Sequence, residues 1–304
     1  MKAPILFLLL STATGVLRAQ EPFSQAEALR QIYSQYDAQK ETAQWVCTDD
    51  QKRDEPHEGW RCAKEDETVS VAVELMAEVQ EGSAEKIYLV TSAKPVSNSD
   101  DYSCHACAPA IGVGVFAWKE QHWALQSANA AVGFYGGLGS PPWVELMQIG
   151  PEKHGVLLSA GDMGGGYASS DKVLLTPLGK TVGEVLRIED EQDDFGAYDP
   201  TDEYSPKVQY RSSAAFRFYA TNTDTGSIAD YYDIELISRG NSSKDLNHLK
   251  PENWTEIYRF TDGKYKLLRH RDFIEVKKPG QKKTSGPMSR PARPVVAPPA
   301  PLAK

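Results

Sequence analysis

Two cysteines, Cys104 and Cys107, are separated by two residues, and two more stand at Cys47 and Cys62. In a reducing compartment a C-x-x-C pair of this kind binds metal ions or exchanges disulfides. In an oxidising compartment it is more often a structural disulfide. The chemistry of the pair therefore depends on where the protein works.

The first residues, 1–19, have the three parts of an export signal. Lys2 precedes the apolar run 5–10, and small residues follow it up to Ala19. The apolar run is shorter than the roughly 20 residues that span a bilayer. We expect cleavage after Ala19 and a soluble periplasmic or secreted protein without a transmembrane segment.

Four cysteines in an exported chain predict two disulfides, for which three pairings exist. The sequence favours the local pairing, Cys47 with Cys62 and Cys104 with Cys107, over the two long-range patterns, which stay open. Loop lengths do not decide the matter, because the three patterns differ by only about 1–2 kcal/mol of chain entropy per bridge.

Three other readings of the C-x-x-C pair have less support. Haem attachment needs a histidine directly after Cys107, where Ala108 stands. A thioredoxin-like site needs a helix after the first cysteine, but 111–116 has the pattern of a strand. A zinc site lacks a second pair at the same spacing. A structural disulfide is therefore the favoured interpretation.

The segment 102–109, which holds this pair, precedes a glycine-spaced strand pattern and Trp118. Together with the glycine-rich stretch near 161–170, it resembles a group of uncharacterised exported proteins of Gram-negative bacteria that carry a Cys-His-Ala-Cys-Ala-Pro element. The resemblance implies export and a β-rich fold. It implies no known activity, cofactor or catalytic residue.

Charge is distributed unevenly along the chain. The formal net charge is -9, yet residues 277–304 carry +7 and residues 1–19 carry +2, which leaves -18 on residues 20–276. Nucleic-acid binding requires clustered basic residues that neutralise phosphates. The acidic core therefore argues against a nucleic-acid partner.

The segment 277–304 has seven prolines, seven basic residues and no acidic residue. Proline removes backbone donors and favours extended conformations, so we expect a disordered tail. Its charge suits an electrostatic contact with an anionic surface.

Residues 20–276 are long enough for a single domain. Ser24 and Glu27 form a capping-box pattern at the start of a helix predicted over about 25–40. About a dozen short alternating segments follow, and Asp262-Gly263 between two of them is typical of a hairpin turn. The sequence predicts a mainly β fold of antiparallel sheets with one N-terminal helix. A sandwich or a curved sheet is expected, with a propeller-like arrangement as the alternative.

Residues 189–203 are rich in carboxylates, which are ligands for Ca²⁺. The spacing departs from the EF-hand loop, because Phe195 stands where glycine is required. No other cofactor is indicated. The predicted weak calcium ligands are Asp190, Asp193, Asp194 and Asp199.

Two further segments could carry chemistry. The glycine-rich segment 159–167 could bind an anion through backbone N–H groups, but no helix pattern follows it, so a hairpin connection is favoured. Ser169 and Lys172 have the S-x-x-K spacing of acyl-transferring enzymes, without the helix and the partner motifs of that chemistry.

Aromatic residues offer a possible binding face for glycans or a protein. They are Trp118, Trp123, Tyr135, Trp143 and Trp254. No motif of a hydrolase or a metalloenzyme occurs, although a dispersed triad would leave no such motif. We therefore expect a non-enzymatic envelope module that binds an envelope protein or a cell-wall component. An envelope hydrolase with a dispersed site is the alternative, and a thiol-disulfide protein using Cys104 and Cys107 is the lesser one.

Overall fold

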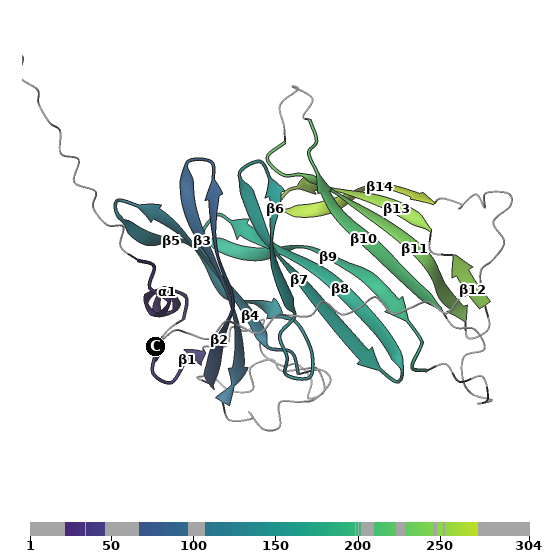
Figure 1. Cartoon of the computed structure of the whole chain (residues 1–304), viewed down its shortest axis with the longest axis horizontal. Helices are drawn as coiled ribbons and strands as arrows, with labels where there is room; N and C mark the ends of the chain where they lie inside the picture. The colour runs from purple at the N-terminus through teal and green to yellow at the C-terminus, as the bar shows by residue number, and fades with distance from the viewer. Residues whose placement is uncertain are drawn as a thin grey trace, which may run out of the picture. The chain divides into compact units, whose positions relative to one another are not determined.

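The computed structural model of the chain (Figure 1) describes residues 22–33, 35–45, 67–96, 107–197, 199, 201, 210–222, 229–245, 248–251 and 253–272. Contacts divide the chain into Met1–Phe273 and Ile274–Lys304, and all described residues belong to the first unit. The predicted export signal and basic tail lie outside the described residues.

The elements are α1 (Gln25–Ile32), β1 (Thr42–Trp45), β2 (Glu67–Glu81), β3 (Ala84–Pro95), β4 (Ala110–Lys119), β5 (His122–Phe134), β6 (Trp143–Gly150), β7 (Lys153–Gly164), β8 (Tyr167–Leu178), β9 (Thr181–Asp193), β10 (Arg211–Tyr219), β11 (Asp233–Asp245), β12 (His248–Pro251), β13 (Trp254–Thr261) and β14 (Lys264–Asp272). They form a five-stranded sheet in the order β1-β2-β3-β4-β5. A nine-stranded sheet runs β14-β13-β11-β10-β9-β8-β7-β6, with β12 paired to β11. All the paired strands are antiparallel, so the predicted mainly β class is confirmed.

The helix α1 is shorter than expected. Ser24 caps it as predicted, because its Oγ accepts a hydrogen bond from the Glu27 N–H at 3.3 Å. The helix ends at Ile32 rather than near residue 40, because Tyr33 takes an extended conformation with φ -109° and ψ 133°. No helix within the described residues is long and apolar enough to cross a membrane.

One hairpin confirms the sequence prediction, and a second hairpin has the same kind of turn. Asp262 and Gly263 join β13 to β14 with φ values of 53° and 79°. Glu120 and Gln121 join β4 to β5 with φ values of 49° and 70°. Positive φ at both central residues is the mark of a type I′ turn, whose twist matches that of the paired strands.

Four strands are covered on both faces, which explains their continuous apolar runs. The run Val156–Leu158 on β7 illustrates the arrangement: Val156 and Leu158 pack with the first sheet, and Leu157 packs on the opposite side with the second half of its own sheet. β3, β4 and β8 have similar buried runs. α1 covers the remaining face of the first sheet.

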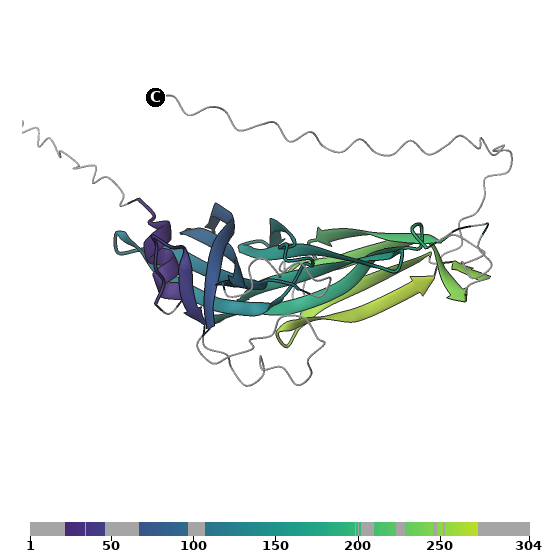
Figure 2. The same ribbon diagram turned by 90° about the horizontal axis from the view of Figure 1, so that it is seen from below.

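The nine-stranded sheet bends so that β6–β9 face β10–β14 (Figure 2). Leu157 and Leu174 from the first half pack in one cluster with Ile234, Leu236 and Tyr265 from the second. The bend lies where β9 meets β10, and this ladder has only the three residue pairs between Glu191–Asp193 and Arg211–Ser213. The described unit is therefore layered, in the order α1, first sheet, β6–β9 and β10–β14.

Candidate functional site

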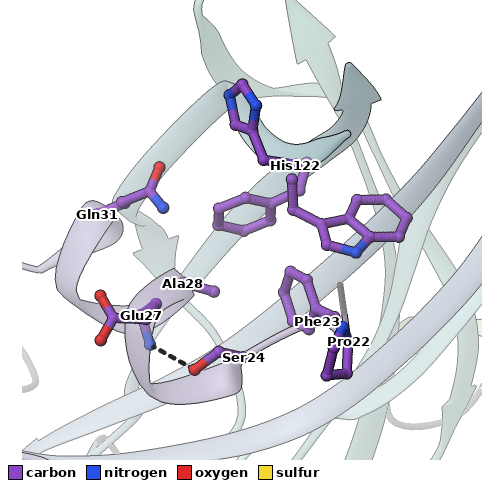
Figure 3. A pocket seen from close by; sticks show the side chains of 9 residues that line it. Pro22, Phe23, Ser24, Glu27, Ala28, Gln31 and His122 are labelled. Atoms are coloured by element: carbon purple, nitrogen blue, oxygen red, sulfur yellow. Dashed lines mark hydrogen bonds between the residues drawn. The ribbon is translucent and has the colours of Figure 1, made fainter. Parts of the chain in front are cut away.

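A pocket lies beside the start of α1, and we name it the helix pocket (Figure 3). Its volume is about 170 Å³. It lies between α1 and the β4–β5 hairpin. The lining side chains used in the argument are Phe23, Glu27, Gln31, Phe116, His122 and Trp123.

Aromatic rings form the apolar part of the helix pocket. The Phe23 ring meets the Phe116 ring edge to face, with centroids 5.3 Å apart, and meets the Trp123 ring in the same way at 5.7 Å. Trp118 supports Trp123 from the side, at 5.4 Å. The Ser24 cap fixes the start of α1 and thereby the position of Phe23 beside the hairpin. Edge-to-face contacts hold such rings in a defined geometry.

The polar part of the helix pocket lies at its rim, where Gln31 and His122 sit at one end and Glu27 at the side (Figure 3). Glu27 forms an ion pair with Arg30 at 2.5 Å. His122 Nδ1 lies 3.4 Å from the Glu120 carbonyl oxygen. The structure records no hydrogen bond joining Glu27, Gln31 and His122, all of which it describes.

A second polar group lies on the inner side of the bent sheet. Lys172 Nζ donates to Ser159 Oγ at 2.5 Å and lies 3.6 Å from Asp190 Oδ2, and Ser170 Oγ donates to Asp190 Oδ1 at 2.5 Å. Burial raises the pKa of the adjacent Glu189 carboxyl, as do the carboxylates of Asp171 and Asp190.

On a strand, the S-x-x-K spacing does not bring the serine and lysine side chains together. Ser169 and Lys172 both belong to β8, where residues three apart point to opposite faces. Lys172 contacts Ser159 instead, because the register of β7 and β8 places these two residues opposite each other.

The four predicted calcium ligands accept hydrogen bonds from separate donors. Asp190 lies on β9 and accepts from Ser170, and Asp193 Oδ1 accepts from the Phe195 N–H. Asp194 Oδ1 accepts from the Tyr210 N–H, while Asp199 Oδ1 accepts from Thr201. Within the described ranges no three His, Cys, Asp or Glu side chains are grouped to hold a metal ion.

The acidic and glycine-rich segments are more regular than the sequence suggested. β9 continues to Asp193, so the first part of 189–203 is strand. β7 continues to Gly164 and β8 begins at Tyr167, which leaves Gly165 and Gly166 as the hairpin turn. The expected hairpin connection within 159–167 is thus present, with a much shorter turn.

One of the four cysteines, Cys107, is described. It packs against the core between α1 and the first sheet, and it is not a free cysteine. Cys47, Cys62 and Cys104 lie outside the described residues, so the pairing pattern stays a prediction.

The five aromatic residues do not share one face. Trp118 and Trp123 belong to the helix pocket region, and Tyr135 is buried with its hydroxyl donating to Glu184 Oε2 at 2.7 Å. Trp143 is 67 % exposed at the edge strand β6, and Trp254 lies on β13 at a separate cavity. The sequence could not show these separations, because they depend on strand order and register.

A buried cluster that the sequence did not reveal joins the two sheets. Glu81 Oε1 accepts from the Tyr88 hydroxyl at 2.8 Å and from the His154 N–H at 2.9 Å, and Oε2 accepts from Lys86 Nζ at 2.6 Å. Burial alone would raise the pKa of Glu81, but the hydrogen bonds from Lys86, Tyr88 and His154 outweigh it and lower the pKa. Burial, followed by the Glu81 charge, raises the pKa of Tyr88. The donors therefore keep Glu81 ionised, and the cluster is a structural link between β2, β3 and β7.

Comparisons of the chain with protein-family models, with curated proteins and with solved structures found no match. Function must therefore be inferred from the sites themselves.

Proposed function

We propose that the protein is an exported, soluble, non-enzymatic binding module of the cell envelope, and that the helix pocket receives one ring-sized apolar group of its partner. The observation that carries this proposal is the pocket itself, where three aromatic rings meet beneath a polar rim. A volume of about 170 Å³ is comparable with the cavities of about 150 Å³ that hold one benzene molecule. Apolar walls with a few polar groups are typical of ligand sites.

The partner class is an envelope protein or a cell-wall component. An aromatic or branched aliphatic side chain matches the apolar walls, and the Gln31 and His122 side chains are placed to hydrogen-bond the neighbouring backbone of such a peptide. We also propose that the protein is periplasmic or secreted, which the resemblance to exported β-rich proteins supports. The basic tail is proposed to contact an anionic surface.

The test uses N-acetyl-phenylalaninamide as a probe in ligand-observed NMR with the mature protein. Saturable binding is expected, and Gln31→Trp, which places a large ring at the rim, should abolish it. Gln126→Trp is the matched control, because Gln126 is exposed elsewhere on β5 and does not line the pocket. Failure of the probe to bind, or equal binding by both variants, would refute the proposed site.

A second candidate, an envelope hydrolase, is favoured by the contact between Lys172 and Ser159. An active serine should react with a fluorophosphonate, and Ser159→Ala should remove the label. No labelling of the native protein would count against this candidate.

The thiol-disulfide alternative and the predicted disulfides share one experiment. Thiol labelling of the exported, unreduced protein should find no free cysteine, and peptide mapping should place Cys104 with Cys107 and Cys47 with Cys62. Reactive thiols at Cys104 and Cys107 would favour redox function instead.

Calcium, proposed for Asp190, Asp193, Asp194 and Asp199, is tested in parallel by measuring the melting temperature with calcium and with a chelator.

A further inference from the structure

A second cavity opens inside the bent sheet, at the line where β9 and β10 part, and we name it the seam cavity. Its volume is about 150 Å³. The side chains used in the argument are Asp190 and Gln192 on β9, Ser212 and Ala214 on β10, Ser238 on β11 and Trp254 on β13. It shares no lining residue with the helix pocket.

The hollow follows from strand register and small side chains. Ala214 pairs with Ser238, and Ser238 pairs with Trp254, so these three lie in one row across β10, β11 and β13. Small residues in this row leave room beside the Trp254 ring.

The wall on the other side is polar. Gln192 pairs directly with Ser212. Asp190, the unpaired residue of a bulge in the ladder between β8 and β9, stands two residues before Gln192 and also lines the cavity. The ladder to β10 ends after three residue pairs, so β9 turns away here and its side chains border a space instead of a neighbouring strand.

Much of the hydrogen-bonding capacity of this lining is unused. Among the described residues no hydrogen bond is recorded for the side chains of Gln192, Ser212 and Ser238, and the buried side-chain polar atoms without a partner are only Asp194 Oδ2 and Thr221 Oγ1. The polar atoms of this lining are therefore open to the space of the cavity. The seam cavity therefore offers donors and acceptors to an occupant.

Asp190 is held in place as an acceptor. Ser170 Oγ donates to its Oδ1 at 2.5 Å, and Lys172 Nζ lies 3.6 Å from its Oδ2. Lys172 is fixed in turn by Ser159 at 2.5 Å. The carboxylate is thus oriented before any ligand arrives, which reduces the entropy lost on binding.

We propose that the seam cavity binds a single sugar ring, as an unmodified or N-acetylated hexose. A pyranose has one face of C–H groups, which packs on an aromatic ring such as that of Trp254, and a rim of hydroxyls that both donate and accept. Carboxylate, amide and hydroxyl side chains match that rim. A space of about 150 Å³ corresponds to one six-membered ring.

The experiment titrates the mature protein with glucose, galactose and N-acetylglucosamine, each followed by protein-observed NMR and by Trp fluorescence. At least one sugar should give saturable shifts. Ser212→Leu, which fills the hollow, should weaken its affinity at least tenfold. Ser213→Leu is the matched control, since Ser213 is exposed on the opposite face of β10, and it should bind as the native protein does.

Asp190→Asn keeps the size of the side chain but changes the acceptor, so it should also weaken binding. Gln31→Trp in the helix pocket should leave sugar binding unchanged, which separates this proposal from the proposed function. The absence of saturable binding for all three sugars, or native affinity in Ser212→Leu, would mean that the cavity holds solvent only. Thermal unfolding of each variant verifies that a loss of binding is not a loss of fold.

Discussion

His270 lies between two carboxylates on the last strand. Its Nδ1 is 2.8 Å from Glu256 Oε1, and its Nε2 is 3.2 Å from Asp272 Oδ1. Glu256 also accepts a hydrogen bond from the Tyr258 hydroxyl. The hydrogen bond to Glu256, followed by that to Asp272, raises the pKa of His270 above its ordinary value of 6.5.

We expect the imidazole of His270 to titrate above pH 6.5 in NMR spectra, and Glu256→Gln to lower that midpoint. Because the folded-state pKa is raised, the stabilisation by His270 is complete below pH 6.5 and is lost as the pH rises through the folded-state value. Asp272→Asn should lower the midpoint by less, since its contact is longer. A native midpoint at or below 6.5 would contradict the two carboxylate contacts.

Single residues with local roles could be predicted from the sequence. Ser24 caps α1, and Asp262-Gly263 forms its turn, because both depend only on neighbours within a few positions. The hydrogen bonds between Ser159 and Lys172 and between Glu81 and His154 could not be predicted. They depend on strand register and sheet packing, which a spacing in sequence does not encode.

At the scale of elements, the glycines of β4 let α1 approach the first sheet. A Cβ on Gly112 would lie 2.6 Å from Thr91 Oγ1, 2.6 Å from the Tyr33 hydroxyl oxygen and 2.7 Å from the Ala130 carbonyl oxygen. The Tyr33 hydroxyl and Thr91 Oγ1 are hydrogen-bonded at 2.7 Å over this glycine. The glycine-spaced strand thus positions the C-terminal end of α1.

Gly112→Ala should lower the free energy of unfolding by about 2 kcal/mol, because the added methyl group overlaps three fixed atoms. Urea denaturation measures this change. Gly161→Ala is the control, since a Cβ there meets only the Ser169 carbonyl oxygen, at 3.6 Å. Equal stability of the two variants would show that α1 can shift to accommodate the methyl group.

The type of each element was more predictable than its length. The sequence predicted a helix to about residue 40, but Tyr33 leaves the helix so that its hydroxyl reaches Thr91. The segment 189–203 has the carboxylate-rich composition of a calcium-binding loop, yet its residues up to Asp193 continue β9, because a neighbouring strand pairs with them. Tertiary contacts overrode local propensity in both cases.

At the scale of the whole described unit, the Glu81 side chain links the five-stranded sheet to the nine-stranded sheet. No described strand of one sheet pairs with a strand of the other. Glu81 comes from β2 of the first sheet and receives hydrogen bonds from His154 of the second. Its side chain is only 5 % exposed. Removing the charge would leave Lys86 without its partner in a largely buried place.

Glu81→Gln should therefore cost about 3 kcal/mol of stability, as does the loss of one partner from a buried ion pair. The lowered pKa of Glu81 means that its contribution is present above about pH 4.5 and disappears as the pH falls through the folded-state value. Urea denaturation at pH 7 measures the loss. Glu78→Gln, at an exposed position of the same strand, should change stability little, and a similar loss in both variants would argue against the link.

The strand order has a consequence for how the chain acquires its structure. Within each sheet, each described strand pairs with the one made just before it, except β13, which pairs with β11 instead of β12. Such a meander has a low contact order for a β protein, because hairpins close over short loops. The first sheet can assemble while later strands are still being synthesised, and each new strand can then pair with a strand that is already in place.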